Sequence, residues 1–183
     1  LLHYRLVHSR PGCWVIIDRV LGAGTHQVEA HWHIDPSWDV ARTGPRTIRA
    51  RHGDGTTVWL LSLRDDCEVF QGSTEEALGW CAPLYGPLVP TSAIRMRRVA
   101  AAPSALVTVI VEASEEPALR DITGDAAPEG TIRFEIAVAA RMEAVVGHDE
   151  DDRVLRELRP HPPDEVVALA VRSLDRVAPG GGE

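Results

Sequence analysis

The sequence predicts an all-β protein, an antiparallel β-sandwich of about ten or more strands. Three observations lead to this prediction. Apolar and polar residues alternate over many short segments, turn residues separate these segments at intervals of about ten residues, and no convincing helical segment lies between them. The chain has 183 residues, 44% of them apolar, which is enough to bury a core. We expect residues 1–183 to form a single domain, with a frayed tail at residues 179–183.

The stretch from Gly12 to Pro36 is expected to organise the fold as a strand, a turn and a second strand. Cys13 to Ile17 is an apolar run that ends at Asp18, which is typical of a strand covered on both faces. Leu21 to Gly24 supplies the turn of this central hairpin. The second strand alternates between an inward set, Val28, Ala30, Trp32 and Ile34, and an outward set, Gln27, Glu29, His31 and His33.

The same alternation predicts the other strands. They are expected at residues 2–7, 47–51, 58–63, 67–71, 94–99, 105–111, 132–138, 142–146 and 154–158. Gly53-Asp54-Gly55 is a strong hairpin turn, and residues 94–99 and 105–111 are interpreted as another hairpin. Residues 164–177 begin like a helix but also alternate, and we favour a strand because everything before them is predicted to be β.

Composition and charge argue against several classes of function. The formal net charge of −8 disfavours a nucleic-acid partner, which requires a basic surface. No apolar run reaches the roughly 18 residues of a membrane span, and the sequence contains no GxSxG, P-loop or GxGxxG motif. The chain starts at Leu1 with a strand-like segment and without an initiator methionine, and no signal peptide is visible. We therefore expect a piece of a longer chain, which would be periplasmic or secreted if that parent carries a signal peptide.

The three cysteines, Cys13, Cys67 and Cys81, show no CxxC spacing. We expect buried free thiols that pack as small apolar side chains. A disulfide between Cys67 and Cys81, or a reactive thiol, is the alternative.

One candidate metal site lies on the predicted strand from His26 to Ile34. Glu29, His31 and His33 share one face, and alternate residues of a strand are about 7 Å apart, close enough for two imidazoles to reach one metal ion. Glu29 would then be a third ligand or would orient an imidazole. The plainer interpretation is a solvated polar face, because a His-x-His pair alone is a weak pattern.

One candidate carbohydrate site lies in and after the long loop at residues 72–91. Trp80 and Tyr85 can stack on sugar rings, because an aromatic face suits the apolar side of a pyranose. Arg95 and Arg97 can meet an acidic polymer. The alternatives are that the two rings anchor the loop to the sheet, and that both arginines lie on a solvated edge strand.

Two groups of residues resemble the heparinase II/III-like polysaccharide lyases, in the later portion of their C-terminal β-sandwich. The first group runs from Tyr4-Arg5 through Trp14-Val15-Ile16-Ile17-Asp18-Arg19-Val20 to Gly24, His26 and His31-Trp32-His33. The second group is Gly79-Trp80-Cys81-Ala82-Pro83-Leu84-Tyr85-Gly86, followed by Pro90. It is similar to a Gly-Trp…Tyr-Gly…Pro stretch of that family. Clear landmarks cover residues 1–112.

The resemblance implies a parent in which a helical toroid precedes antiparallel β-sheets and which cleaves uronic-acid polysaccharides by β-elimination. In that family a tyrosine or histidine acts as base or acid, and a Gly-His-x-His segment helps to bind a structural zinc in some members. None of these motifs occurs in this chain. We therefore carry over no catalytic or metal residue and expect no cofactor here, although zinc is an expectation for the parent.

Three hypotheses follow. The favoured one is a C-terminal β-sandwich that supports the polysaccharide cleft of a lyase, inactive by itself, with the upstream toroid of the same polypeptide and an acidic polysaccharide as partners. The second is an autonomous carbohydrate-binding module that uses Trp80 and Tyr85. The third is a small metal-binding protein that uses Glu29, His31 and His33.

Overall fold

The computed structural model describes residues 1–84, 86–121, 132–137, 145–148, 154–157 and 168–171. Within these ranges all regular structure is strand and every strand pairing is antiparallel, which confirms the predicted fold class. The described ranges hold no helix that is long and apolar enough to cross a membrane. The chain divides into two compact units, Leu1–Glu116 and Pro117–Glu183. The single-domain organisation stays a prediction.

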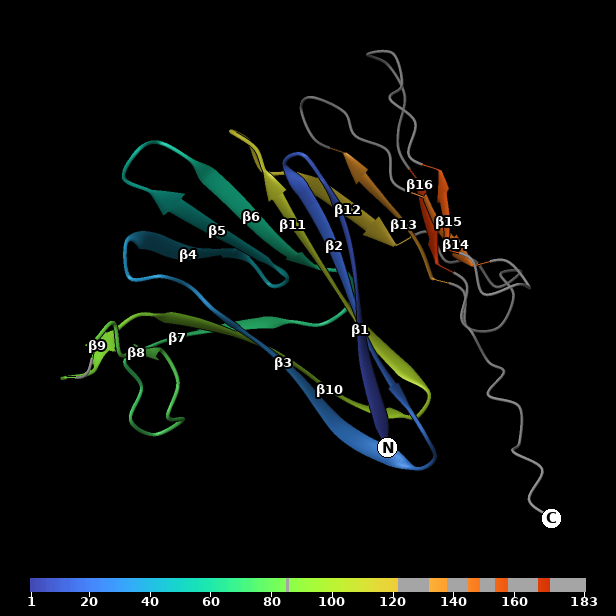
Figure 1. Ribbon diagram of the computed structural model, residues 1–183, viewed down its shortest axis with the longest axis horizontal. Coiled ribbons are helices and arrows are strands. Elements are labelled where there is room, and N and C mark those ends of the chain that lie inside the picture. Colours follow the sequence, from blue (N-terminus) through green and yellow to red (C-terminus); the bar gives the residue numbers. More distant parts are fainter. Residues whose placement is uncertain (85, 122–131, 138–144, 149–153, 158–167, 172–183) are drawn as a thin grey trace. The chain divides into compact units, whose positions relative to one another are not determined.

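The first unit contains a large and a small sheet (Figure 1). The large sheet has the order β1-β2-β11-β6-β5-β4, and its strands are β1 (Leu2–Arg10), β2 (Cys13–Leu21), β11 (Ser104–Glu112), β6 (Thr57–Ser62), β5 (Thr47–His52) and β4 (Trp38–Gly44). The small sheet has the order β3-β10-β7, formed by β3 (Thr25–His33), β10 (Ser92–Ala101) and β7 (Cys67–Gln71). A short ladder joins β8 (Trp80–Cys81) to β9 (Val89–Pro90).

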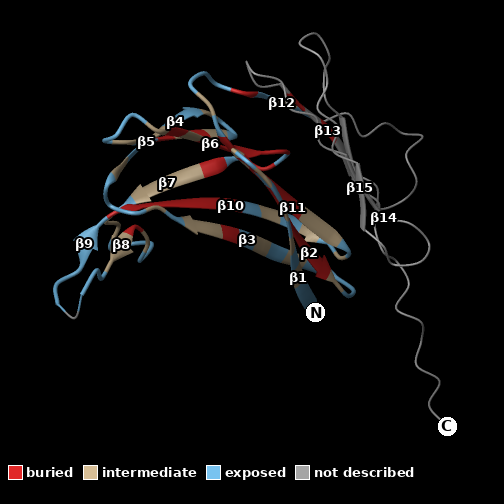
Figure 2. Ribbon diagram, turned by 45° about the horizontal axis from the view of Figure 1, so that its top comes forward, coloured by how far each residue is buried: buried red, intermediate tan, exposed pale blue. Residues whose placement is uncertain are grey.

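The two sheets pack face to face over an apolar core, which makes the first unit a β-sandwich. The buried cluster takes side chains from both sheets: Ala30, Ile48, Leu60, Cys67, Ile94, Met96 and Leu106. Figure 2 shows the buried stretches on β10, β6 and β11. The inward set predicted for β3 is confirmed, because Val28, Trp32 and Ile34 pack against this cluster and Ala30 belongs to it.

Strand β2 is covered on both faces, as predicted, but it is longer than expected. Val15 and Ile16, which point to opposite faces, are 1% and 4% exposed. The strand does not end at Asp18 but continues to Leu21, and Asp18 and Arg19 are buried within it. The predicted end was wrong because the carboxylate of Asp18 is accommodated inside the fold by residues of β1.

Two predicted hairpins are wrong. Strand β2 pairs with β1 and β11, and β3 pairs with β10, so the turn at Leu21–Gly24 carries the chain from one sheet to the other. In the same way, β10 and β11 follow each other in the sequence but lie in different sheets. The structure also contains β4, an edge strand that was not predicted because its exposed positions interrupt any apolar pattern.

The hairpin between β5 and β6 is confirmed, with its turn at Gly53–Gly55. In this turn the Thr56 amide donates a hydrogen bond of 2.9 Å to Asp54 Oδ1. The hydrogen bonds from Thr56, followed by one from His52, lower the pKa of Asp54 to about 2.

The second unit also consists of antiparallel strands where it is described. One sheet has the order β12 (Ala118–Asp121), β13 (Ile132–Ala137) and β16 (Ala168–Val171), and one ladder joins β14 (Val145–His148) to β15 (Val154–Glu157). Within residues 164–177 the described part is therefore strand, as favoured. Phe134 and Ile136 are buried. The predicted tail at 179–183 and most of the strand at 142–146 lie outside the described residues.

The cysteines agree with the favoured interpretation of the sequence. All three are free, with Cys13 and Cys67 buried and Cys81 half-buried, so the alternative disulfide between Cys67 and Cys81 is absent. Burial raises the pKa of the Cys13 thiol to about 11 and that of the Cys67 thiol to about 12.

Candidate functional site

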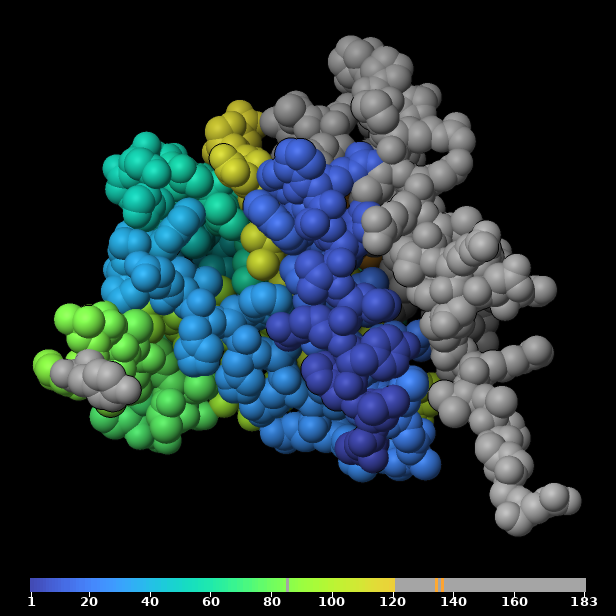
Figure 3. All heavy atoms as spheres, in the orientation of Figure 1, coloured from blue at the N-terminus to red at the C-terminus, as the bar shows by residue number. Residues whose placement is uncertain are grey.

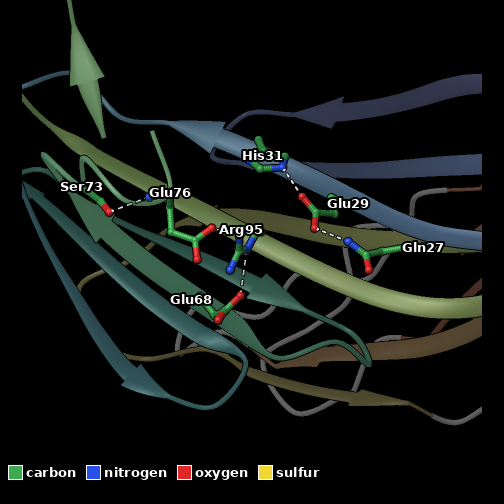
Figure 4. Close-up of polar contacts among 7 residues, drawn as sticks. All are labelled: Gln27, Glu29, His31, Glu68, Ser73, Glu76 and Arg95. Carbon is green, nitrogen blue, oxygen red and sulfur yellow. Dashed lines mark hydrogen bonds and ion pairs between the residues drawn. The ribbon is translucent and has the colours of Figure 1, made fainter. Parts of the chain in front are cut away.

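The outer face of the small sheet collects most of the predicted site residues. In the strand register Arg95 of β10 lies opposite His31 of β3 and Glu68 of β7, and Arg97 lies opposite Glu29. Directly opposed residues of antiparallel strands point to the same face. The register therefore places the predicted metal ligands and the predicted arginines on one face, which the sequence alone did not indicate. Figure 4 shows Glu29, His31 and Arg95 on this face.

Arg95 is held by the protein itself. It is 6% exposed, and its guanidinium donates hydrogen bonds to Glu68 at 2.9 Å and to Glu76 at 2.7 Å. The same group lies 4.6 Å from the centre of the Phe70 ring. The hydrogen bonds to Glu68 and Glu76 raise the pKa of Arg95, and the hydrogen bond from Arg95 lowers the pKa of Glu68. The arginines do not lie on an edge strand, because β10 is the central strand of its sheet, and Arg95 is not solvated.

Arg97 has a different environment. It is exposed and lies opposite Glu29, two residues along β10 from Arg95. Of the two predicted arginines, Arg97 is the one whose side chain is open to a ligand, whereas Arg95 ties a loop residue, Glu76, to the sheet.

The predicted metal set forms a short polar row along β3. His31 Nε2 lies 2.9 Å from Glu29 Oε2, and Gln27 donates a hydrogen bond of 2.9 Å to Glu29 Oε1. The hydrogen bond from His31, together with the one from Gln27, holds the pKa of Glu29 below its usual value. His33 is exposed. In the described part of the chain no three His, Cys, Asp or Glu side chains are grouped so as to hold a metal ion.

The loop after β7 folds back on itself, and Trp80 is part of that packing. The Trp80 indole donates a hydrogen bond of 3.1 Å to the Ser73 carbonyl, and Ser73 also forms an isolated bridge with Leu78. Gly79 adopts φ +77°, and a Cβ there would lie 2.7 Å from the carbonyl oxygen of Phe70. The second predicted aromatic, Tyr85, lies outside the described residues.

A second polar cluster, between β1 and β2, was not identified from the sequence. Asp18 is 3% exposed and accepts two hydrogen bonds from Arg5, at 2.7 and 2.9 Å, while His3 Nε2 lies 2.9 Å from Asp18 Oδ1. The hydrogen bond to Asp18 raises the pKa of Arg5. The Arg5 guanidinium also lies 5.0 Å from the centre of the Trp32 ring on β3. The available signal was an acid inside an apolar strand, which requires a cationic partner.

The fold is similar to that of solved heparinases. A structure of heparan sulfate lyase HepC from Pedobacter heparinus, in a mutant form, matches with a TM-score of 0.59 and 14% identity, over 86% of this chain and 24% of that one. A heparinase III structure matches with a TM-score of 0.54 and 18% identity, over 74% of this chain and 22% of that one. The chain thus spans less than a quarter of the length of either protein.

Comparison with the curated proteins finds no match. The family model described as heparinase II/III-like, C-terminal, matches residues 1–136, which include all of the first unit. The chain therefore belongs to the heparinase II/III-like C-terminal family.

Proposed function

We propose that this chain is the C-terminal β-sandwich of a polysaccharide lyase, that it supports the cleft for a uronic-acid polysaccharide, and that it is not catalytic by itself. The family match over residues 1–136 carries this proposal. The matched HepC structure is titled a heparan sulfate lyase, and this chain corresponds to 24% of it. The upstream partner in this proposal is a helical toroid of the same polypeptide.

The chemistry of the outer face is consistent with a supporting role. Arg95 is neutralised by Glu68 and Glu76, and Glu29 is hydrogen bonded to His31. A general base must lie within reach of the substrate proton and have a pKa near the working pH. The lowered pKa of Glu29 instead favours a permanently ionised carboxylate.

A cleavage assay tests the proposal. β-Elimination of a uronic acid creates a C=C bond conjugated with the carboxylate, which absorbs in the ultraviolet. The purified chain, mixed with heparin, heparan sulphate or alginate, is expected to leave the absorbance unchanged. A polypeptide in which a helical toroid precedes this chain is expected to produce the absorbing product from one of these polymers. Cleavage by the chain alone would refute the supporting role.

Within this role we propose that the loop at residues 72–91 and the neighbouring strand contact the polysaccharide. Trp80 and Tyr85 would stack on sugar rings and Arg97 would meet an acidic group, while Arg95 would position the loop through Glu76. Loss of polysaccharide binding in Trp80→Ala, with unchanged circular dichroism, would support this arrangement. Unchanged binding in both Trp80→Ala and Arg97→Gln would contradict it.

The metal-binding hypothesis for Glu29, His31 and His33 is tested by elemental analysis of the purified chain. Stoichiometric zinc that disappears in His31→Ala would support it. A metal-free preparation that takes up no zinc on dialysis would reject it.

A further inference from the structure

The inner face of the large sheet is wider than the small sheet that covers it. Residues that lie directly opposite each other on neighbouring strands point to the same face of a sheet. Leu106 belongs to the core and lies opposite Asp18, and Asp18 lies opposite Arg5, so all three point to the inner face. Alternation then places four further side chains on the inner face, and with Arg5 they form a ledge: His3, Arg5, Val7 and Ser9 on β1, and Trp14 on β2.

The ledge is open although it belongs to the core side of the sheet. Val7 is 60% exposed and Trp14 is 37% exposed, and the side chains of Arg5 and His3 are 42% and 58% exposed. Figure 3 shows β1 at the surface of the molecule, beside β3. The ledge therefore combines an accessible indole with two basic side chains.

Arg5 is held in one orientation on this ledge. Asp18 binds its Nε and Nη2 atoms, and Trp32 lies against the guanidinium at 5.0 Å. Asp18 takes two of the five N–H donors of the guanidinium, so outward donors remain for a ligand. A guanidinium fixed in this way loses little conformational entropy when it binds a carboxylate or sulfate, and it can bind either group in a bidentate manner.

Trp14 and Arg5 are separated by a length that suits a short oligosaccharide. Trp14 pairs with Ser9, four residues along β1 from Arg5. At about 3.3 Å per residue this is about 13 Å. Ser9 lies beside Trp14 and Val7 lies between Ser9 and Arg5, so one surface presents an indole, a hydroxyl and a fixed cation.

We propose that the ledge is a binding site for an acidic oligosaccharide, in which Trp14 stacks on one sugar ring and Arg5, assisted by His3, binds the carboxylate or sulfate of another. This site is separate from the loop that carries Trp80, and the inference rests on the proposed function for the class of ligand. An apolar protein partner fits less well, because it would take Arg5 and His3 out of water without supplying acceptors. A sugar chain supplies hydroxyls and acidic groups.

Isothermal titration of the purified chain with a size-defined heparan sulfate oligosaccharide tests the site. Trp14→Ala and Arg5→Lys are each expected to weaken binding about five- to tenfold. This is the effect expected from losing one ring-stacking contact or one bidentate ion pair. Lysine keeps a cation beside Asp18, so this variant is expected to fold. A neutral oligosaccharide of equal length is expected to bind weakly and to be insensitive to Arg5→Lys. Val99→Ala, an exposed position outside the ledge, serves as the matched control.

Several outcomes would overturn the inference. These are the absence of binding, binding that both ledge variants leave unchanged, or a wild-type dimer that Trp14→Ala converts to a monomer in light scattering. Binding that is lost only in Trp80→Ala would reject the ledge and leave the proposed function standing. Cleavage of the oligosaccharide by the chain alone would reject the proposed supporting role and leave the ledge to be judged by its own variants.

Discussion

Replacing Ile94 by alanine tests whether the two sheets close over a common core. Ile94 is 1% exposed and lies between Trp32 on β3 and Val69 on β7, with its side chain in the cluster shared by both sheets. Truncation to alanine removes three side-chain carbons and leaves a cavity, because the surrounding side chains of the two packed sheets relax only partially into the space. Buried Ile→Ala substitutions cost about 2–5 kcal/mol, and we expect a loss near the middle of that range, about 3–4 kcal/mol, because the site is almost completely buried.

Urea denaturation followed by tryptophan fluorescence measures this loss. All five tryptophans lie in the first unit, so the signal reports the unfolding of that unit. Val99→Ala is a matched control on the same strand, since Val99 is 69% exposed, and it is expected to cost about 0.5 kcal/mol or less. A loss below about 1 kcal/mol for Ile94→Ala, with an unchanged m-value, would show that the sheets do not close there.

Three further results are expected. Gly79→Ala destabilises the first unit more than Gly53→Ala, since a Cβ at Gly79 meets backbone atoms at 2.7 Å whereas one at Gly53 meets nothing within 4 Å; equal midpoints in urea would contradict this. Asp54 has a folded pKa of about 2 against 3.8 unfolded, so its stabilising effect is complete above pH 3.8 and disappears as the pH falls towards 2. Asp54→Asn should therefore flatten the dependence of stability on pH in that window, and an unchanged slope would argue against the turn hydrogen bonds. In native protein a thiol reagent should modify Cys81 first and the two buried cysteines only on unfolding, and three equally fast thiols would contradict the burial.

Alternation in the sequence was sufficient to predict which way side chains point. The inward and outward sets of β3 were both predicted correctly, because a period of two fixes the face of each residue. It does not fix the partner strand. The segments before and after Leu21–Gly24 looked like a hairpin, yet they belong to different sheets, and nothing local in a glycine-rich turn distinguishes the two connections.

The candidate site was predictable only in its residue types. Arg95 was interpreted as a contact for an acidic polymer or as part of a solvated edge, but it is buried. The loop after β7 brings Glu76 onto the sheet, and that contact spans 19 positions of sequence. Asp18 was expected to end a strand, but Arg5 and His3 reach it from a neighbouring strand. Charged residues that depend on distant partners cannot be assigned from local patterns.

The two connections that carry the chain between the sheets have a consequence for folding. Both β2–β3 and β10–β11 join neighbours in sequence that lie in opposite layers, so neither layer can be completed from one continuous segment. The ladders of β11 on β2, of β11 on β6 and of β10 on β3 then close long loops, the first across some 90 residues, and proteins with such non-local pairings fold slowly. A truncated gene product that ends before β10 would therefore lack the central strand of the small sheet and the strand that joins β2 to β6 in the large sheet, so neither layer would be complete.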